Sequence, residues 1–114
     1  ANGNSLGAAV GNNAGGYNYG AAVGRYARGY EYGAVVGDGA RGYTYGAAVG
    51  YGAYGNYFGV AVGNYSRGWY NGTSIGYQAG HSLTTYANPN KNILVGHKAG
   101  YNLTQPSAWA ASTS

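Results

Sequence analysis

The chain has 114 residues, of which 24 are glycine and 15 are tyrosine, and only 7% are charged, so its composition is far from that of an ordinary globular domain. Its large aliphatic side chains are too few to fill such a domain's core at native packing density, which argues against an enzyme built around a deep pocket. The net charge is +4, but the basic residues form no run, so we expect no nucleic-acid ligand. No apolar run approaches the length of a membrane-spanning helix, so we expect no membrane insertion.

A repeat of 13 residues organises the chain from its N-terminus. A shortened first repeat ends at Gly11, and five full repeats follow it. They span residues 12–24, 25–37, 38–50, 51–63 and 64–76, and each ends in Val-Gly or Ile-Gly. The segment 77–96 is the same unit with a seven-residue insertion, and 97–114 begins in register and then diverges. Internal repeats of this kind are typical of solenoids.

The repeat favours strands over helices. Glycine costs roughly 1 kcal/mol relative to alanine inside a helix, and each repeat holds three or four of them. Short alternations of tyrosine, valine and alanine between glycines are typical of strands. Thirteen residues suit one coil of two short strands and two tight turns, with successive coils paired in parallel about 4.8 Å apart. The sequence therefore predicts an all-β chain, a parallel β-solenoid or β-roll of about seven 13-residue coils.

Residues at the same position of successive repeats form columns, and one column supplies the predicted core. It contains the β-branched residue that precedes the last glycine of each repeat. We refer to Val10, Val23, Val36, Val49, Val62, Ile75 and Val95 as the valine column. We predict that it faces inward, either within each coil or at an axis shared by several chains. Because so thin a roll buries little apolar area, we also expect the chain to associate with copies of itself.

The C-terminal part departs from the regular repeat. We expect a roll domain over residues 1–105, interrupted by an insertion at about 82–92, and an irregular tail over 106–114. Asn88-Pro89-Asn90 favours a turn in the insertion, and proline removes a ladder donor. We expect the strand to resume at 93–95.

The repeats resemble those of two groups of surface fibres. The unit x-x-A-x-G-x-x-x-G-A-A-V-G is similar to the head repeat of trimeric autotransporter adhesins of the YadA type. Thr73–Thr85 and Asn92–Thr104 resemble the glycine-, tyrosine- and asparagine-rich repeats of bacteriophage tail fibres. The resemblance extends to about Gln105, although the period here is 13 rather than about 14 and the tyrosine content is higher. It implies a left-handed, trimeric β-roll used as a fibre segment or adhesive head.

No residue pattern indicates catalysis, a cofactor or a metal. Glu31 and Asp38, which are the only carboxylates of the side chains, fall in different columns, so they do not form an acid–base pair. His81 lies beside Ser82, but no acid is near enough in the sequence to complete a triad. Two histidines, His81 and His97, are too few for a zinc site. We therefore expect no enzyme activity and no cofactor.

A column of arginines is the candidate binding surface. Arg28, Arg41 and Arg67 share one repeat position, which Tyr54 interrupts, and each precedes an aromatic residue by two positions: Tyr30, Tyr43 and Trp69 respectively. Guanidinium groups beside aromatic rings suit the recognition of anions and sugars. The alternative is a solvated ladder that only stabilises the surface of a fibre. The tyrosines likewise suit either strand packing, with Tyr pairs on one strand face, or a binding surface.

The sequence thus predicts a structural fibre segment with an adhesive surface, extracellular, on a virion or a cell exterior. Its expected partners are copies of itself and a polysaccharide of the host surface. A self-assembling extracellular filament subunit that needs no receptor is the alternative. An ice-binding solenoid is a third hypothesis, which the sequence favours less because the expected ladders are of tyrosine rather than threonine.

Overall fold

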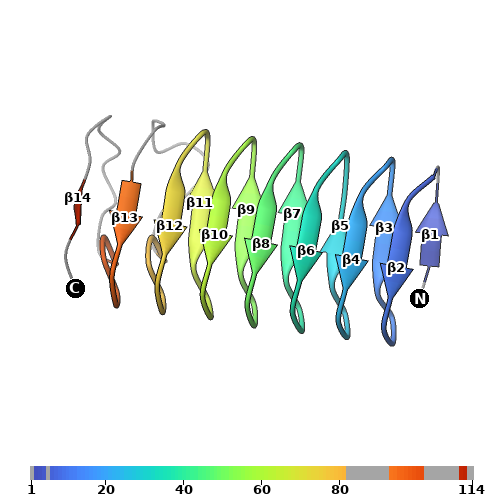
Figure 1. The fold of residues 1–114 in the computed structure, drawn as a ribbon, viewed down its shortest axis with the longest axis horizontal. Helices are drawn as coiled ribbons and strands as arrows, with labels where there is room; N and C mark the ends of the chain where they lie inside the picture. The colour runs from blue at the N-terminus through green and yellow to red at the C-terminus, as the bar shows by residue number, and fades with distance from the viewer. Residues whose placement is uncertain (1, 5, 82–92, 102–110, 113–114) are drawn as a thin grey trace.

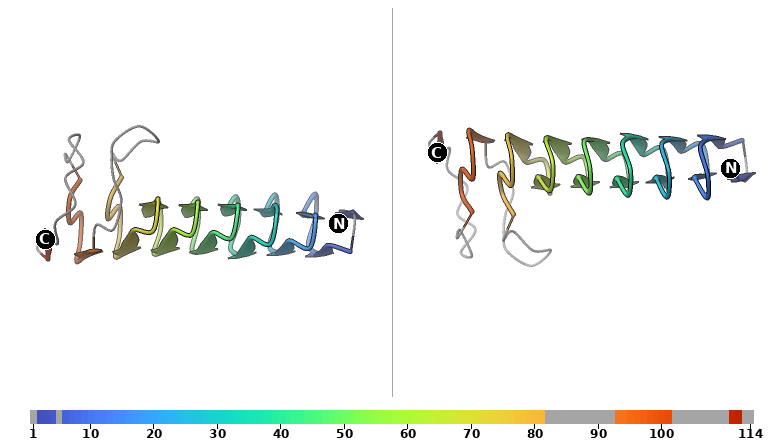
Figure 2. Two further views of the ribbon diagram at one scale, coloured as in Figure 1. Left: turned by 90° about the horizontal axis from the view of Figure 1, so that it is seen from above. Right: turned by 90° about the horizontal axis from the view of Figure 1, so that it is seen from below.

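The computed structural model describes residues 2–4, 6–81, 93–101 and 111–112, and they form a parallel β-solenoid. Two sheets run along its length, one behind the other in Figure 1 and edge-on in Figure 2. Through residues 2–75 the chain alternates between the sheets, so each regular coil contributes one strand to each. The principal extents are 37 × 21 × 15 Å, which correspond to a narrow slab.

Short strands make up both sheets, and all pairs of neighbouring strands are parallel. The six-stranded sheet contains β1 (Asn2–Asn4), β3 (Gly15–Tyr17), β5 (Arg28–Gly29), β7 (Arg41–Tyr43), β9 (Tyr54–Asn56) and β11 (Arg67–Trp69). The eight-stranded sheet contains β2 (Ala8–Val10), β4 (Ala21–Val23), β6 (Ala34–Val36), β8 (Ala47–Val49), β10 (Val60–Val62), β12 (Thr73–Ile75), β13 (Ile93–Val95) and β14 (Ala111–Ser112). Strand partners are 13 residues apart through the regular repeats, as the period predicts.

The number of regular coils is lower than predicted. About five turns have a strand in both sheets, from β2 with β3 to β10 with β11, whereas the sequence led us to expect about seven. Strands β12 and β13 extend the eight-stranded sheet, and β13 confirms that the strand resumes at Ile93. Residues 77–81 and 97–101 form turns instead of strands of the other sheet. The predicted insertion and most of the tail lie outside the described residues.

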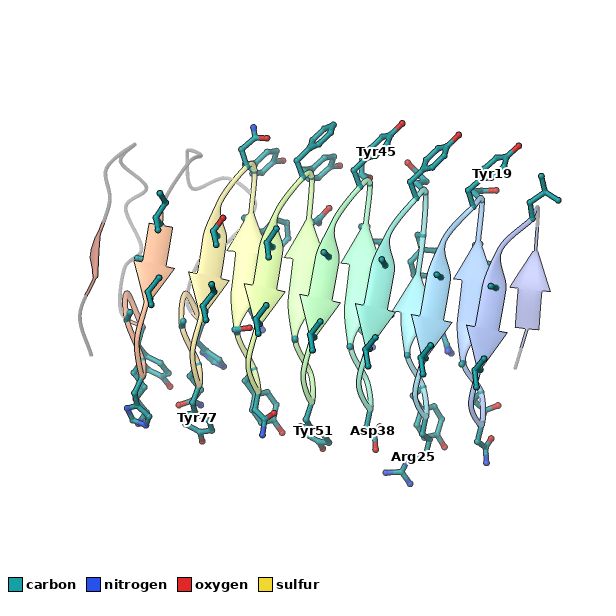
Figure 3. The ribbon with its side chains drawn as sticks, viewed as in Figure 1. Tyr19, Arg25, Asp38, Tyr45, Tyr51 and Tyr77 are labelled. Carbon is teal, nitrogen blue, oxygen red and sulfur yellow. The ribbon has the colours of Figure 1, made fainter. Side chains whose placement is uncertain are left out.

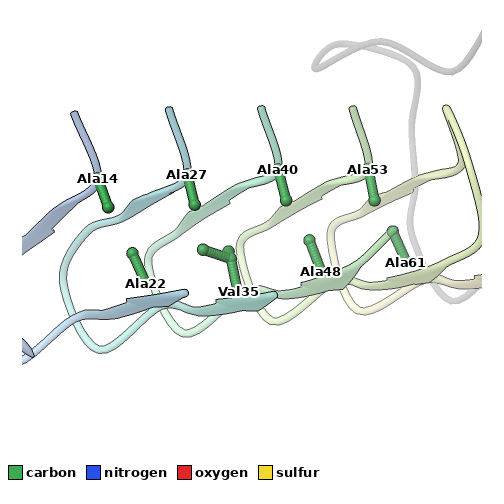
Figure 4. Packing of buried hydrophobic residues seen from close by; sticks show 8 residues of the cluster. All are labelled: Ala14, Ala22, Ala27, Val35, Ala40, Ala48, Ala53 and Ala61. Carbon is green, nitrogen blue, oxygen red and sulfur yellow. The ribbon is translucent and has the colours of Figure 1, made fainter. Parts of the chain in front are cut away.

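The interior of the slab is lined mainly by alanine and glycine. From β2 to β13, each strand of the eight-stranded sheet turns its central residue inward, and each coil adds one small residue from the turn that follows, an alanine except at Ser66. The buried cluster consists of Ala14, Ala22, Ala27, Val35, Ala40, Ala48, Ala53 and Ala61 (Figure 4). Opposite the strand alanines lie the buried glycines Gly16, Gly29, Gly42, Gly55 and Gly68. A methyl group added at Gly55 would lie 2.3 Å from the carbonyl oxygen of Ala47, so the two backbones are nearly in contact.

The prediction that the valine column lies within each coil is wrong. Its members are exposed on the outer surface of the eight-stranded sheet, by 47% at Val49, for example, whereas Ala48 is fully buried. The reason is the closeness of the two sheets. Adjacent strand residues point to opposite faces, so either the valine or the alanine before it must face inward. The inward position faces the glycine backbone of the other sheet, and in the five regular coils it holds alanine four times and valine once, at Val35.

Two kinds of turn close each coil, and both need left-handed backbone. At one edge, Gly24 has a φ of +130°, which strongly favours glycine, and a Cβ there would lie 2.6 Å from the Gly37 carbonyl oxygen of the next coil. At the other edge, the amide of Gly20 donates a 2.8 Å hydrogen bond to the carbonyl oxygen of Tyr17. The central residues Asn18 and Tyr19 both have positive φ, as a type I′ turn requires.

This second turn corrects the prediction that paired tyrosines share one strand face. In the segment Gly16–Gly20, Tyr17 ends the strand, but Tyr19 lies in the turn. A non-glycine residue in the left-handed region costs about 1–2 kcal/mol. Tyr32, Tyr45 and Phe58 adopt the same conformation in later coils. Their stacking, described below, offsets this cost.

Candidate interaction surfaces

The outer face of the eight-stranded sheet is an apolar surface with no covering element among the described residues. The valine column forms one row of this face, with exposed fractions from 37% at Val62 to 64% at Val10. The residue two positions before each of these forms the second row. That row contains Ala8, Ala21, Ala34, Ala47, Val60, Thr73 and Ile93. Side chains of both rows project from the front strands in Figure 3. A contiguous apolar surface of this kind marks an interaction site in soluble proteins.

The outer face of the six-stranded sheet carries arginine and aromatic side chains instead of aliphatic ones. The structure places Arg28, Arg41 and Arg67 on it in register, with Tyr54 between the last two. Tyr43 and Trp69 lie two residues further along their strands and therefore point to the same side, and Tyr30 directly follows its strand. All six candidate binding residues are thus brought to one face of the slab.

The aromatic residues of this face stack along the solenoid. The ring centroids of Tyr17 and Tyr30 are 5.0 Å apart, and those of Tyr30 and Tyr43 are 4.7 Å apart, with interplanar angles of 11° and 5°. Tyr54 and Trp69 extend the stack. We call these five residues the strand-end ladder. Because ring faces within the stack are covered by neighbouring rings, the ladder presents ring edges and hydroxyl groups to solvent.

The arginine residues differ in their contacts. Arg28 donates from its guanidinium group to the carbonyl oxygens of Asn13 and Ala27, which turns it toward the corner of the coil. In the described part of the chain, neither Arg41 nor Arg67 forms an ion pair. Arg28 and Arg41 are direct strand partners, so the two side chains start from adjacent backbone positions. Their guanidinium groups differ in that only Arg28 is fixed to the corner by hydrogen bonds.

Burial raises the pKa of Tyr43 above its ordinary value, and the neighbouring Tyr54 adds to the effect. The Tyr43 hydroxyl therefore stays protonated at physiological pH and can donate a hydrogen bond. This matters for the face as a whole, because arginine and neutral tyrosine are both donors. The surface is thus rich in groups that complement oxyanions.

Arg25 belongs to another edge of the molecule. Its Nη2 lies 2.7 Å from Oδ2 of Asp38 in the next coil, and this pairing raises the pKa of Arg25. Figure 3 shows both residues at the same edge as Tyr51 and Tyr77. The Arg25 side chain is 62% exposed, and exposed pairs of this kind contribute little to stability. Arg25 is therefore a structural neighbour of Asp38 rather than a member of the arginine face.

A second aromatic stack lines the opposite edge, where Figure 3 shows Tyr19 and Tyr45. We call Tyr19, Tyr32, Tyr45 and Phe58 the turn ladder. Successive centroids are 5.0, 4.9 and 5.0 Å apart, with interplanar angles of 5°, 2° and 3°. All four side chains are more than half exposed. Backbone hydrogen bonds between the turns, such as Tyr45 N to Glu31 O at 3.0 Å, hold the rings in register.

The structure supports no catalytic arrangement of the residues considered above. Asp38 pairs with Arg25, whereas Glu31 lies in a turn of the other kind and accepts a 3.4 Å hydrogen bond from Thr44. His81 stacks on Tyr101, and burial together with Arg67 lowers its pKa. The described residues contain no group of three or more potential metal ligands and no pocket. They also contain no helix of the length and hydropathy needed to cross a membrane.

No protein-family model, curated protein or solved structure matches the chain. The function is therefore inferred from the geometry of its two outer faces.

Proposed function

We propose that the chain is a structural segment of an extracellular fibre, on a virion or a cell exterior. In this proposal, copies of the chain pack through the outer face of the eight-stranded sheet. The outer face of the six-stranded sheet stays exposed and serves as the adhesive surface. The observation that carries the proposal is the contrast between these faces, one apolar and one rich in arginine and tyrosine, on a slab only 15 Å in its shortest extent.

Copies of the same chain are the favoured occupant of the apolar face for two reasons. First, the interior consists mainly of alanine, so a single solenoid buries little apolar area per residue. Packing valine columns together removes further apolar surface from water and stabilises the folded state. Second, the rows of one copy repeat at the strand spacing of about 4.8 Å, and the rows of another copy have the same spacing. Their side chains can therefore interdigitate along the whole length.

The resemblance to fibre repeats leads us to propose three copies around a shared axis, each with a left-handed coil. This proposal assigns the valine column to the axis, which is the other position that the sequence allowed for it. The mass of the native protein tests the number of copies. A mass of three chains supports a fibre of fixed width. An open-ended series of masses supports the alternative, a self-assembling filament subunit without a receptor.

For the adhesive face, we propose an anionic polysaccharide of the host surface as the partner. The covered ring faces leave little room for a sugar to stack, so recognition rests on guanidinium groups and hydroxyls. Such contacts repeat along a polymer at the spacing of the coils, and several copies in a fibre add avidity. Because exposed charges are screened within about 8 Å at physiological ionic strength, binding should weaken as salt increases.

The test compares two variants for binding to a sulfated polysaccharide at low and high salt. One variant replaces Arg41 and Arg67 with glutamine, and the control replaces Arg25 and Lys98, which lie outside the arginine face. Both lose two positive charges. We expect binding to be lost in the first variant and retained in the second. Equal binding by the two would show that only net charge matters and that the arginine face is a solvated ladder.

An ice-binding solenoid is a second candidate, favoured by one observation. The apolar face carries small side chains in two regular rows on a regular sheet, whereas the sequence had suggested only tyrosine ladders. This function requires the face to be free, and the fibre requires it to be covered. A monomeric chain that slows ice recrystallisation would support ice binding and contradict the fibre.

A further inference from the structure

We propose that Tyr19, Tyr32 and Tyr45 form an oxidative cross-linking site, in which dityrosine bonds join neighbouring coils of one chain. The oxidant would be hydrogen peroxide used by a haem peroxidase. This inference rests on the turn ladder and requires neither the apolar face nor the arginine face to act as proposed.

The three rings are held in the arrangement that the coupling needs. Tyr32 lies between Tyr19 and Tyr45, with centroids 5.0 and 4.9 Å away and planes within 5° of parallel. The rings come from equivalent turns of consecutive coils, so each ortho carbon has its counterpart in the next ring close by. Hydrogen bonds between the turns, including Tyr32 N to Asn18 O at 3.1 Å, keep them there. Coupling within the chain is therefore favoured over coupling between chains, because the partner is already in place.

The site is also open to an oxidant. Each of the three residues is more than 50% exposed, so its ring can be reached from solvent. The chain contains no cysteine or methionine, the side chains whose sulfur would otherwise react first. Oxidation would therefore fall on the aromatic residues, and among the tyrosines on those that are exposed.

The reaction balances as follows. Peroxidase removes one electron and one proton from each of two tyrosines, and the two phenoxyl radicals form one carbon–carbon bond between ortho carbons. The hydrogen on each of these carbons moves to the phenoxyl oxygen and restores the phenol. The two electrons and two protons reduce one hydrogen peroxide to two waters. Each cross-link thus lowers the mass of the chain by two hydrogens.

The chain contains its own controls. Phe58 continues the same stack at 5.0 Å from Tyr45 but has no hydroxyl to lose. It also shows that phenylalanine fits the column. Tyr26 is 49% exposed, close to the value for Tyr32, but its column neighbours in the adjoining coils are Asn13 and Gly39. If exposure alone determined reactivity, Tyr26 and Tyr32 would be equally reactive. If stacking determines it, Tyr32 is the more reactive of the two.

The experiment treats the dilute full chain with peroxidase and hydrogen peroxide and maps the products after trypsin digestion. Cleavage after Arg25, Arg28 and Arg41 places the three ladder tyrosines in different peptides and leaves Tyr26 in the short peptide 26–28. We expect peptide pairs joined through Tyr32, which fragmentation locates, and a higher melting temperature of the oxidised chain. Tyr32→Phe should lose both pairs, and Tyr30→Phe should keep them.

Three results would overturn the proposal. The first is that joined peptides persist in Tyr32→Phe. The second is that cross-links include Tyr26 as often as Tyr32. The third is that cross-links form only between chains. Repetition in denaturant separates folded geometry from intrinsic reactivity, because the selectivity for Tyr32 should disappear when the chain unfolds. Selectivity that survives unfolding would also count against the site.

Discussion

Tyr54 fills the place in the strand-end ladder that Asn56 leaves without a ring. Tyr54 belongs to the arginine column, yet its ring lies 5.4 Å from that of Tyr43 and 5.2 Å from that of Trp69. Asn56, at the ladder position itself, is only 7% exposed, and its Oδ1 and the Nε1 of Trp69 are buried without hydrogen-bond partners within the described chain. Two irregularities of the repeat therefore compensate each other.

This relationship predicts that the two positions are coupled. Tyr54→Arg should destabilise the chain by about 1–3 kcal/mol, because it removes two aromatic pairs of roughly 0.5–1.5 kcal/mol each. Asn56→Tyr should also destabilise it, because two rings would then compete for one place. The double variant restores the regular pattern and should be more stable than the sum of the single effects predicts. Denaturant unfolding of all four proteins measures the coupling, and additive effects would contradict it.

The close approach of the two sheets predicts a large cost for a single methyl group. Gly55→Ala would place its Cβ 2.3 Å from the Ala47 carbonyl oxygen, which belongs to backbone held in a sheet. We expect a loss of about 3 kcal/mol or more, or a chain that does not fold.

Gly39→Ala is the matched control, measured in the same unfolding experiment. No atom lies within 4 Å of the added Cβ, and only the positive φ of +70° is unfavourable. The expected loss is about 1–2 kcal/mol. If the two variants are equally stable, the sheets are further apart than the structure places them.

The partly buried position of His81 predicts a dependence of stability on pH. Its pKa is lowered in the folded state, by burial first and by Arg67 second. The unfolded chain therefore binds this proton more readily, so the contribution of His81 is present above a pH of about 6.5 and is lost as the pH falls through the folded-state pKa. Melting temperatures between pH 7.5 and 5 should fall in the native chain. The fall should be smaller in His81→Gln, and His97→Gln should retain it.

Much of the fold could be predicted because the repeat constrains it. The 13-residue period fixes strand pairing, so the parallel register and the shared face of Arg41 and Tyr43 follow from the sequence alone. Two of the glycine columns, those of Gly20 and Gly24, lie at the corners of each coil, whereas that of Gly16 lies within a strand. A period does not, however, reveal which side of a strand faces inward.

Two predictions were wrong because they concern contacts between sheets or between coils, which the sequence alone does not reveal. In Ala47–Val49, hydrophobicity favours burying the valine, but Ala48 is the residue that faces the interior, where the backbone of the other sheet approaches across glycine. The prediction that Tyr19 shares a strand face with Tyr17 rests on their two-residue spacing, and it fails because Tyr19 has a positive φ, which bulky residues rarely adopt. The ring of Tyr19 stacks on a ring of the next coil, and this contact can be recognised only when the positions of the coils are known. The bridging role of Tyr54 depends in the same way on contacts between coils.

Ala48 and Val49 allow the most direct test of the central claim, that valines cover a surface between copies and alanines fill the interior. The measurement is the native mass of Val49→Asp and Ala48→Asp, with circular dichroism to monitor folding. We predict that Val49→Asp folds but falls from an oligomer to a monomer, and that Ala48→Asp does not fold, because it buries an unpaired charge. A Val49→Asp variant that keeps the oligomeric mass of the native chain would contradict the account.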